Sequence, residues 1–99
     1  MDVPKVWKDR SGDYVIVPQG ANASYRWPRE VSLRFDKRTG LLLLSYLFPG
    51  QRSSFPLLFP NDGEAVIAGT GTNLGDRIRA READGEVFLE WSGLLLQRK

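Results

Sequence analysis

The sequence contains no histidine and no cysteine. The absence of cysteine excludes disulfide bonds and thiolate metal ligands. The absence of histidine removes the commonest general base, the usual partner of a serine or cysteine nucleophile, and the commonest metal ligand. We therefore expect a protein that is not an enzyme and that holds no cofactor and no metal.

Long hydrophobic runs and a strong excess of one charge are also missing. The most apolar stretch, Leu41–Phe48, is far too short to span a bilayer. Residues 1–20 are interrupted by charges and contain no apolar segment typical of a signal peptide. The net charge of +2 permits nucleic-acid binding without requiring it. We expect a soluble protein, cytoplasmic by default; the alternative is a secreted protein whose leader has been removed.

What the sequence does contain is a regular series of turn signals. Its 99 residues are enough for one domain and too few for two. The short apolar or alternating segments between the turns are Tyr14–Val17, Val31–Phe35, Leu41–Phe48, Ser54–Phe59, Glu64–Ala68, Arg77–Glu82, Val87–Trp91 and Leu94–Gln97. This pattern predicts an all-β, single-domain antiparallel meander barrel of about eight strands over residues 1–99, with a β-sandwich as the alternative.

One hairpin is predicted around Asp84-Gly85, a strong signal for a type I′ turn. The turn pairs Ala83 with Glu86, Glu82 with Val87, Arg81 with Phe88, Ala80 with Leu89, Arg79 with Glu90 and Ile78 with Trp91. One face of the hairpin is then apolar, and the other face places arginines opposite a glutamate and a phenylalanine. Because a helix over residues 76–83 gives no such agreement, this segment is predicted as a strand.

A second hairpin is predicted at Asp36–Gly40, where the aspartate side chain can accept from backbone N–H groups and the glycine can be left-handed. Pairing Asp36 with Leu41 gives a good core face but leaves Leu41, Leu43 and Leu47 on the nominal outer face. These leucines require cover from another element, a ligand or a partner chain, and a homodimer is one such partner. The proline-containing segment 55–60, expected at an edge or bulge, either covers them or joins an interaction surface.

The stretch VIAGTGTNLGDRIRARE resembles a nucleotide-binding turn only superficially. The third glycine of a dinucleotide fingerprint falls one place late at Gly75, and the lysine of a phosphate-binding loop is missing. The stretch is therefore interpreted as a connection between two strands. Its polar residues Thr70, Thr72 and Asn73 are candidate ligand contacts at the mouth of a barrel.

Several other residues are candidates for binding. Tyr25 and Trp27 alternate with arginines, an arrangement that suits stacked bases or sugars as well as ordinary core packing. The row Arg77, Arg79, Arg81 either tracks phosphates or keeps one strand face soluble. Glu82 falls beside Val87 on the apolar face and is either a site acid or a carboxylate reaching solvent. Trp91, on the same face, is a further ligand candidate.

The layout resembles the calycins, the lipocalin and avidin group of small barrels. The resemblance rests on Trp7 before the first strand and Arg98 in the ending LLLQRK. Calycins often pack a tryptophan of this kind against a late arginine, although their usual Gly-x-Trp is Lys5-Val6-Trp7 here. The resemblance implies a closed barrel with a non-catalytic binding role.

Three functions remain open at this point. The first is a non-catalytic binding module for a small apolar or amphipathic molecule or for a protein surface, which the leucine excess and the missing catalytic side chains favour. The second is a small barrel that binds single-stranded nucleic acid through Tyr25, Trp27 and the arginine row. The third, least favoured, is a carboxylate-only hydrolase centred on Glu82.

Overall fold

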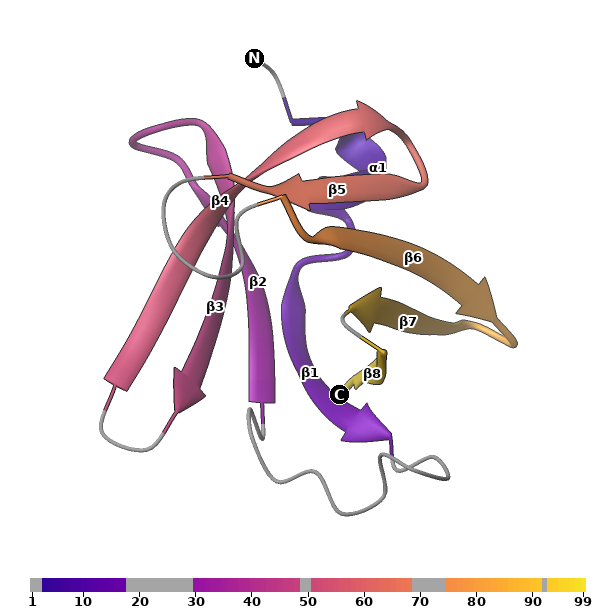
Figure 1. Cartoon of the computed structure of the whole chain (residues 1–99). Coiled ribbons are helices and arrows are strands. Elements are labelled where there is room, and N and C mark those ends of the chain that lie inside the picture. The colour runs from indigo at the N-terminus through magenta and orange to yellow at the C-terminus, as the bar shows by residue number, and fades with distance from the viewer. Residues whose placement is uncertain (1–2, 18–29, 49–50, 69–74, 92) are drawn as a thin grey trace.

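The computed structural model describes residues 3–17, 30–48, 51–68, 75–91 and 93–99. Within these ranges the chain forms a short helix followed by eight antiparallel strands that close into a barrel in sequence order (Figure 1). The elements are α1 (Lys5–Lys8), β1 (Gly12–Val17), β2 (Glu30–Asp36), β3 (Leu41–Phe48), β4 (Gln51–Asn61), β5 (Glu64–Ile67), β6 (Arg77–Ala83), β7 (Glu86–Trp91) and β8 (Leu94–Arg98). Strand β1 pairs with β8 and closes the ring. The predicted meander barrel is confirmed.

The hairpin between β6 and β7 has the predicted register at every pair from Ala83–Glu86 to Ile78–Trp91. Asp84 and Gly85 take φ values of 53° and 79°, which is the left-handed pair that a type I′ turn requires. Ile78 and Leu89 are fully buried, whereas Arg79 is exposed. The turn chemistry therefore fixes which face of β6 carries the arginines.

The hairpin between β2 and β3 also follows its prediction, from Asp36–Leu41 to Val31–Tyr46. The Asp36 carboxylate accepts from the Arg38 backbone N–H at 2.9 Å and from the Thr39 hydroxyl at 3.0 Å. Gly40 closes the turn with φ 74°. This register directs Leu42 and Leu44 into the core and leaves the intervening leucines on the outer wall.

Strand β4 contains the segment 55–60, whose prolines were expected to confine it to an edge or a bulge. Pro56 lies in a strand with neighbours on both sides, opposite Leu43 of β3. Its carbonyl accepts from the Ala68 N–H at 2.9 Å, and Ala68 lies just beyond the end of β5. Since a strand residue directs its N and O toward the same neighbour, the proline nitrogen faces the point where the β5 ladder ends. The register irregularity expected of such a segment is present further along, between Leu58 and Asn61.

Helix α1, which the sequence pattern does not predict, covers one end of the barrel (Figure 1). Trp7 is fully buried, and its ring lies 5.5 Å from that of Phe59. The Arg10 guanidinium lies over the Trp7 ring at 4.7 Å, and Arg98 donates to the Asp9 carbonyl at 2.8 Å. The tryptophan and the late arginine named by the calycin resemblance therefore both lie at this end, which we call the α1 end.

Candidate interaction surface on the barrel wall

The described interior of the barrel is filled by side chains. Trp7 occupies the α1 end, and an aromatic cluster occupies the opposite end, where the Tyr46 ring lies 5.7 Å from Phe55 and 5.4 Å from Trp91. Between them lie fully buried aliphatic residues such as Leu44 and Leu89. Close packing of this kind leaves little room for an internal ligand. The outer wall therefore offers the surface on which a ligand can bind.

An apolar strip crosses the outer wall over β3, β4 and β5. It consists of Leu41, Leu43, Pro56, Leu58, Val66 and Ala68. The strand register makes the strip continuous, since Leu43 pairs with Pro56 and Leu58 pairs with Val66. Leu58 is 43% exposed and the other members are half-buried. Two of the three leucines expected on the outer face, Leu41 and Leu43, thus lie in the strip, whereas the side chain of Leu47 lies outside the described residues.

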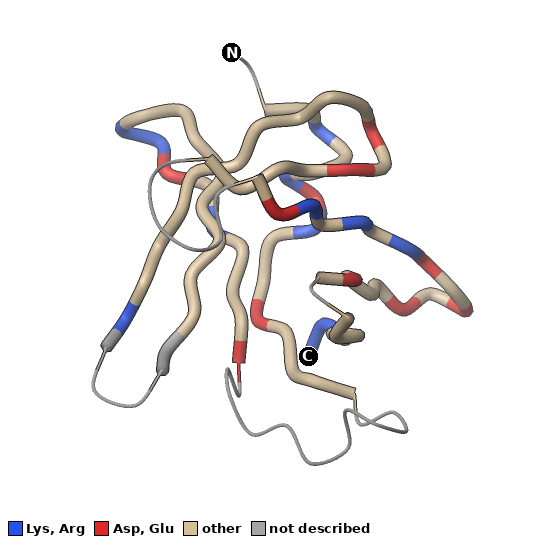
Figure 2. Tube along the Cα trace, viewed as in Figure 1, with Lys and Arg blue, Asp and Glu red and all other residues tan. Residues whose placement is uncertain are grey.

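Each margin of the apolar strip carries an arginine. Arg34 of β2 pairs with Leu43, and Arg77 of β6 pairs with Val66. Arg34 donates to the Asp13 carboxylate at 2.9 Å, and Arg77 donates to Glu64 at 2.9 Å. Figure 2 shows this contrast: most residues of β3 and β4 are uncharged, whereas basic residues recur along β6. The strip is therefore an apolar surface with a cationic side chain at both edges.

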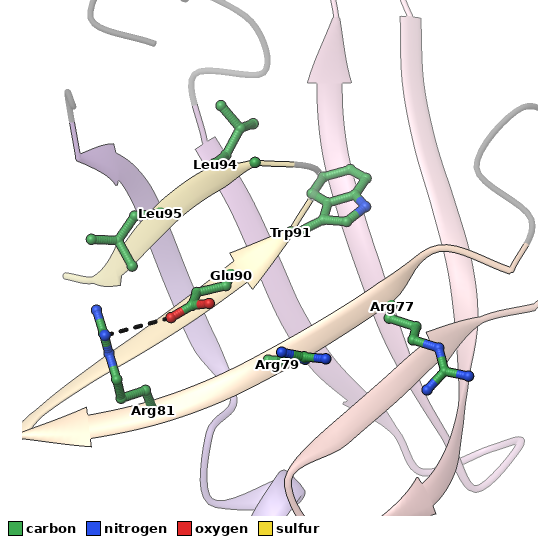
Figure 3. A pocket seen from close by; sticks show the side chains of 8 residues that line it. Arg77, Arg79, Arg81, Glu90, Trp91, Leu94 and Leu95 are labelled. Atoms are coloured by element: carbon green, nitrogen blue, oxygen red, sulfur yellow. Dashed lines mark ion pairs between the residues drawn. The ribbon is translucent and has the colours of Figure 1, made fainter. Parts of the chain in front are cut away.

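A groove of about 560 Å³ lies next to the strip, along β6 and the turn between β7 and β8. We call it the β6 groove (Figure 3). Arg77, Arg79 and Arg81 line it from β6, and Glu90, Trp91, Gly93, Leu94 and Leu95 line it from β7, β8 and their turn. Its volume lies within the range of typical ligand sites. The predicted arginine row is thus gathered on one wall of a single groove.

The arginines of the β6 groove are held by two glutamates. Glu64 of β5 accepts from Arg77 and lies 3.8 Å from the Arg79 Nε. Glu90 lies 3.6 Å from Arg81 (Figure 3). The arginine side chains remain between 57% and 67% exposed. These exposed pairs contribute little to stability, so the row is available to interact with a charged partner.

Trp91 is part of the core and is not exposed to solvent. It is only 5% exposed, and its indole N–H donates to the Asp76 carboxylate at 3.2 Å. Its ring packs on Tyr46 inside the barrel. The residue therefore contributes the end wall of the β6 groove and anchors the strands behind it.

Glu82 lies near the end of β6, where its side chain approaches Arg10 just after α1. Its side chain is 61% exposed and its carboxylate lies 3.9 Å from the Arg10 Nε. Nearby, the buried Tyr14 hydroxyl donates to the Arg10 carbonyl at 2.5 Å. Burial raises the pKa of Tyr14 to about 12, against the opposing influence of Arg98 and Arg10. Glu82 therefore reaches solvent beside a guanidinium, close to the β6–β7 turn.

A smaller polar hollow of about 200 Å³ lies over β1 to β4. Its lining includes Asp13, Ser32, Arg34 and Ser45, which the sequence reasoning did not select. The serines face outward because they alternate with core residues, and the register pairs Asp13 with Ser32 and Ser32 with Ser45. This alternation was visible in the sequence, but single serines on a strand carry no functional signal.

The remaining candidates, Tyr25, Trp27, Thr70, Thr72 and Asn73, lie outside the described residues, as do most of the glycine-rich connection and the polar stretch 18–28. The structure therefore brings together the arginine row and Trp91, whereas Leu41 and Leu43 lie on β3, separated from β6 by β4 and β5. In the described part of the chain no helix is long and apolar enough to cross a membrane. Over the same residues no cluster of three or more acidic side chains is arranged to hold a metal ion.

Together the fold and the wall define a closed antiparallel barrel with an apolar strip beside a cationic groove. Comparison with protein-family models finds no match, and comparisons with curated proteins and with solved structures find no significant match.

Proposed function

We propose that this chain is a non-catalytic binding module whose ligand is a segment of another protein, held on the outer wall of the barrel. The observation that carries the proposal is the apolar strip, a continuous surface over three neighbouring strands that includes the exposed Leu58. Contiguous apolar surface of this kind is typical of interaction sites. A binding role agrees with what the calycin resemblance implied, and the filled interior favours a site on the outer wall.

The exposure of the strip indicates what kind of partner fits. Most of its members are half-buried already, so the strip offers less than the ~800 Å² per partner of a standard stable interface. A short segment with a few apolar side chains matches this area. The flanking Arg34 and Arg77 favour acidic residues at the ends of that segment.

Single-stranded nucleic acid is the second candidate, because three arginines stand on one face of β6. Such binders also need exposed aromatic side chains for base stacking. Among the described residues Trp7, Tyr14, Tyr46 and Trp91 are buried, and the half-buried Phe88 lies under the Arg81 guanidinium. Tyr25 and Trp27 lie outside the described residues. Glu64 and Glu90 also place negative charge within the row. The wall therefore fits a peptide better than a phosphate backbone.

The proposal is tested by selecting binders for the purified chain from a displayed random peptide library. We expect the selected peptides to combine apolar and acidic residues. Leu58→Asp should weaken their binding about tenfold or more, since it places a charge in the apolar contact. Ser54→Asp is the matched control, because Ser54 is an exposed residue on the same strand and face.

Binding of the selected peptides should survive in the control variant. The proposal fails if the library yields no binder, or if both variants bind the selected peptides as well as the native chain does.

A further inference from the structure

We infer that the β6 groove receives an extended acidic segment, whose carboxylates at alternate residues pair with Arg77, Arg79 and Arg81. The inference rests on the proposed function and specifies the chemistry of the partner. It is carried by the placement of three arginines on one wall of a groove that an apolar strip adjoins.

The spacing of the three arginines along β6 matches the side-chain repeat of an extended peptide. Alternate residues of a strand lie about 6.6 Å apart on one face, and the three arginines occupy alternate positions of β6. An extended peptide that runs along β6 repeats its own side chains at the same interval. Acidic residues at every second position therefore meet the arginines one to one, whereas a contiguous acidic block directs half of its carboxylates away.

The existing ion pairs of Arg79 and Arg81 are long. The Arg79 Nε lies 3.8 Å from Glu64, and the Arg81 Nη1 lies 3.6 Å from Glu90. Both distances exceed those of a good hydrogen bond. A partner carboxylate at about 2.8 Å forms a stronger, charge-assisted contact. Arg77 already donates to Glu64 at 2.9 Å. Glu64 and Glu90 together offset two of the three arginine charges, so the row keeps a surplus of one positive charge.

The wall of the β6 groove opposite the arginines is low and apolar. Leu94 and Leu95 are almost fully buried and form a low apolar surface beside Gly93, which has no side chain. This leaves room for small residues between the acidic ones of the partner.

The experiment uses the full chain and fluorescein-labelled synthetic peptides, followed by fluorescence anisotropy. One peptide carries aspartate at three alternate positions separated by threonine, and a second has the same composition with the aspartates contiguous. A labelled oligothymidylate serves as the nucleic-acid arm. We expect the alternating peptide to bind at least about fivefold more tightly than the contiguous one, with an affinity that falls as salt screens the groove.

Arg79→Gln should weaken binding of the alternating peptide about tenfold, because it removes one charge-assisted contact. Arg38→Gln is the control, since Arg38 is an exposed arginine in the β2–β3 turn and lies outside both the apolar strip and the β6 groove. Equal binding of the two peptides, tighter binding of the oligothymidylate, or no effect of Arg79→Gln overturns the inference. If library peptides respond to Leu58→Asp but not to Arg79→Gln, the proposed function stands and this inference alone fails.

Discussion

At the scale of one residue, the burial of Tyr14 has a measurable effect on the pKa of its hydroxyl. Its ring is fully buried, and burial raises the pKa of its hydroxyl to about 12. The folded chain therefore holds this proton more tightly than the unfolded chain, in which the pKa is near 10. The stabilising contribution is complete below pH 10 and is lost as the pH rises from about 10 to about 12.

We expect the free energy of unfolding to fall across that window by up to about 1.4 kcal/mol per pH unit from this residue. Urea unfolding at a series of pH values measures it. In Tyr14→Phe this part of the pH dependence should disappear, while the loss of the hydrogen bond to Arg10 lowers the stability at neutral pH by about 0.5–1.5 kcal/mol. Identical pH profiles for the two proteins above pH 10 contradict the assignment.

Gly85 carries a second prediction, because the β6–β7 turn depends on its left-handed backbone at φ 79°. Gly85→Ala should lower the free energy of unfolding by about 1–2 kcal/mol, which is the cost of a left-handed conformation for a residue with a Cβ. Gly63→Ala is the matched control in the β4–β5 turn. A Cβ there makes only an ordinary contact of 3.5 Å with Asn61, so the control should lose no stability. Equal losses in both variants would mean that backbone strain is not the cause.

At the scale of an element, α1 acts as a cover for the barrel rather than as a helix with its own stability. It has only four residues, too few to be stable alone, and its contribution to the core is Trp7. Trp7→Ala should cost about 3–5 kcal/mol. Trp7→Phe should cost less, because it keeps an aromatic ring and removes an indole N–H that has no hydrogen-bond partner among the described residues.

Thermal and urea unfolding measure the stability of both Trp7 variants. Lys5→Ala in the same helix is the control, since its exposed ion pair with Asp9 contributes at most about 0.5 kcal/mol. If Trp7→Ala unfolds like this control, the α1 end is not part of the cooperative core.

The strands were predictable because their signals are local. Asp84-Gly85 and Asp36–Gly40 each fix a turn, and each turn fixes the register of two strands. Helix α1 was not predictable in this way, because a single turn of helix has no periodicity to detect and is retained by the burial of Trp7. The bulge expected of the proline-containing segment is present between Leu58 and Asn61. The place of Pro56 between two paired strands was not predictable, because whether its nitrogen faces a ladder bond depends on where the neighbouring strand ends.

The candidate surface was only partly predictable, since exposure depends on strands far apart in sequence. The outward direction of Leu41 and Leu43 follows from one hairpin, and so does the arginine row. Leu58 and Val66 extend the leucines into a strip only because of the β3–β4 and β4–β5 pairings. No short turn motif specifies these pairings. Likewise, the wall of the β6 groove opposite the arginines comes from β8, and only the complete ring of strands places it there.

For the whole molecule, the remaining question is whether two copies associate through the strip. Burial of a leucine contributes roughly 1.5–3 kcal/mol when it is fully removed from water, but Leu41 and Leu43 are already half-buried. Two-fold packing of the strips with their strands aligned brings the arginine margins of one copy against those of the other, which opposes association. We therefore expect a monomer at micromolar concentration in sedimentation velocity, with Leu43→Glu leaving the sedimentation coefficient unchanged. A native dimer that Leu43→Glu converts into a folded monomer would instead make the second copy the occupant of the strip.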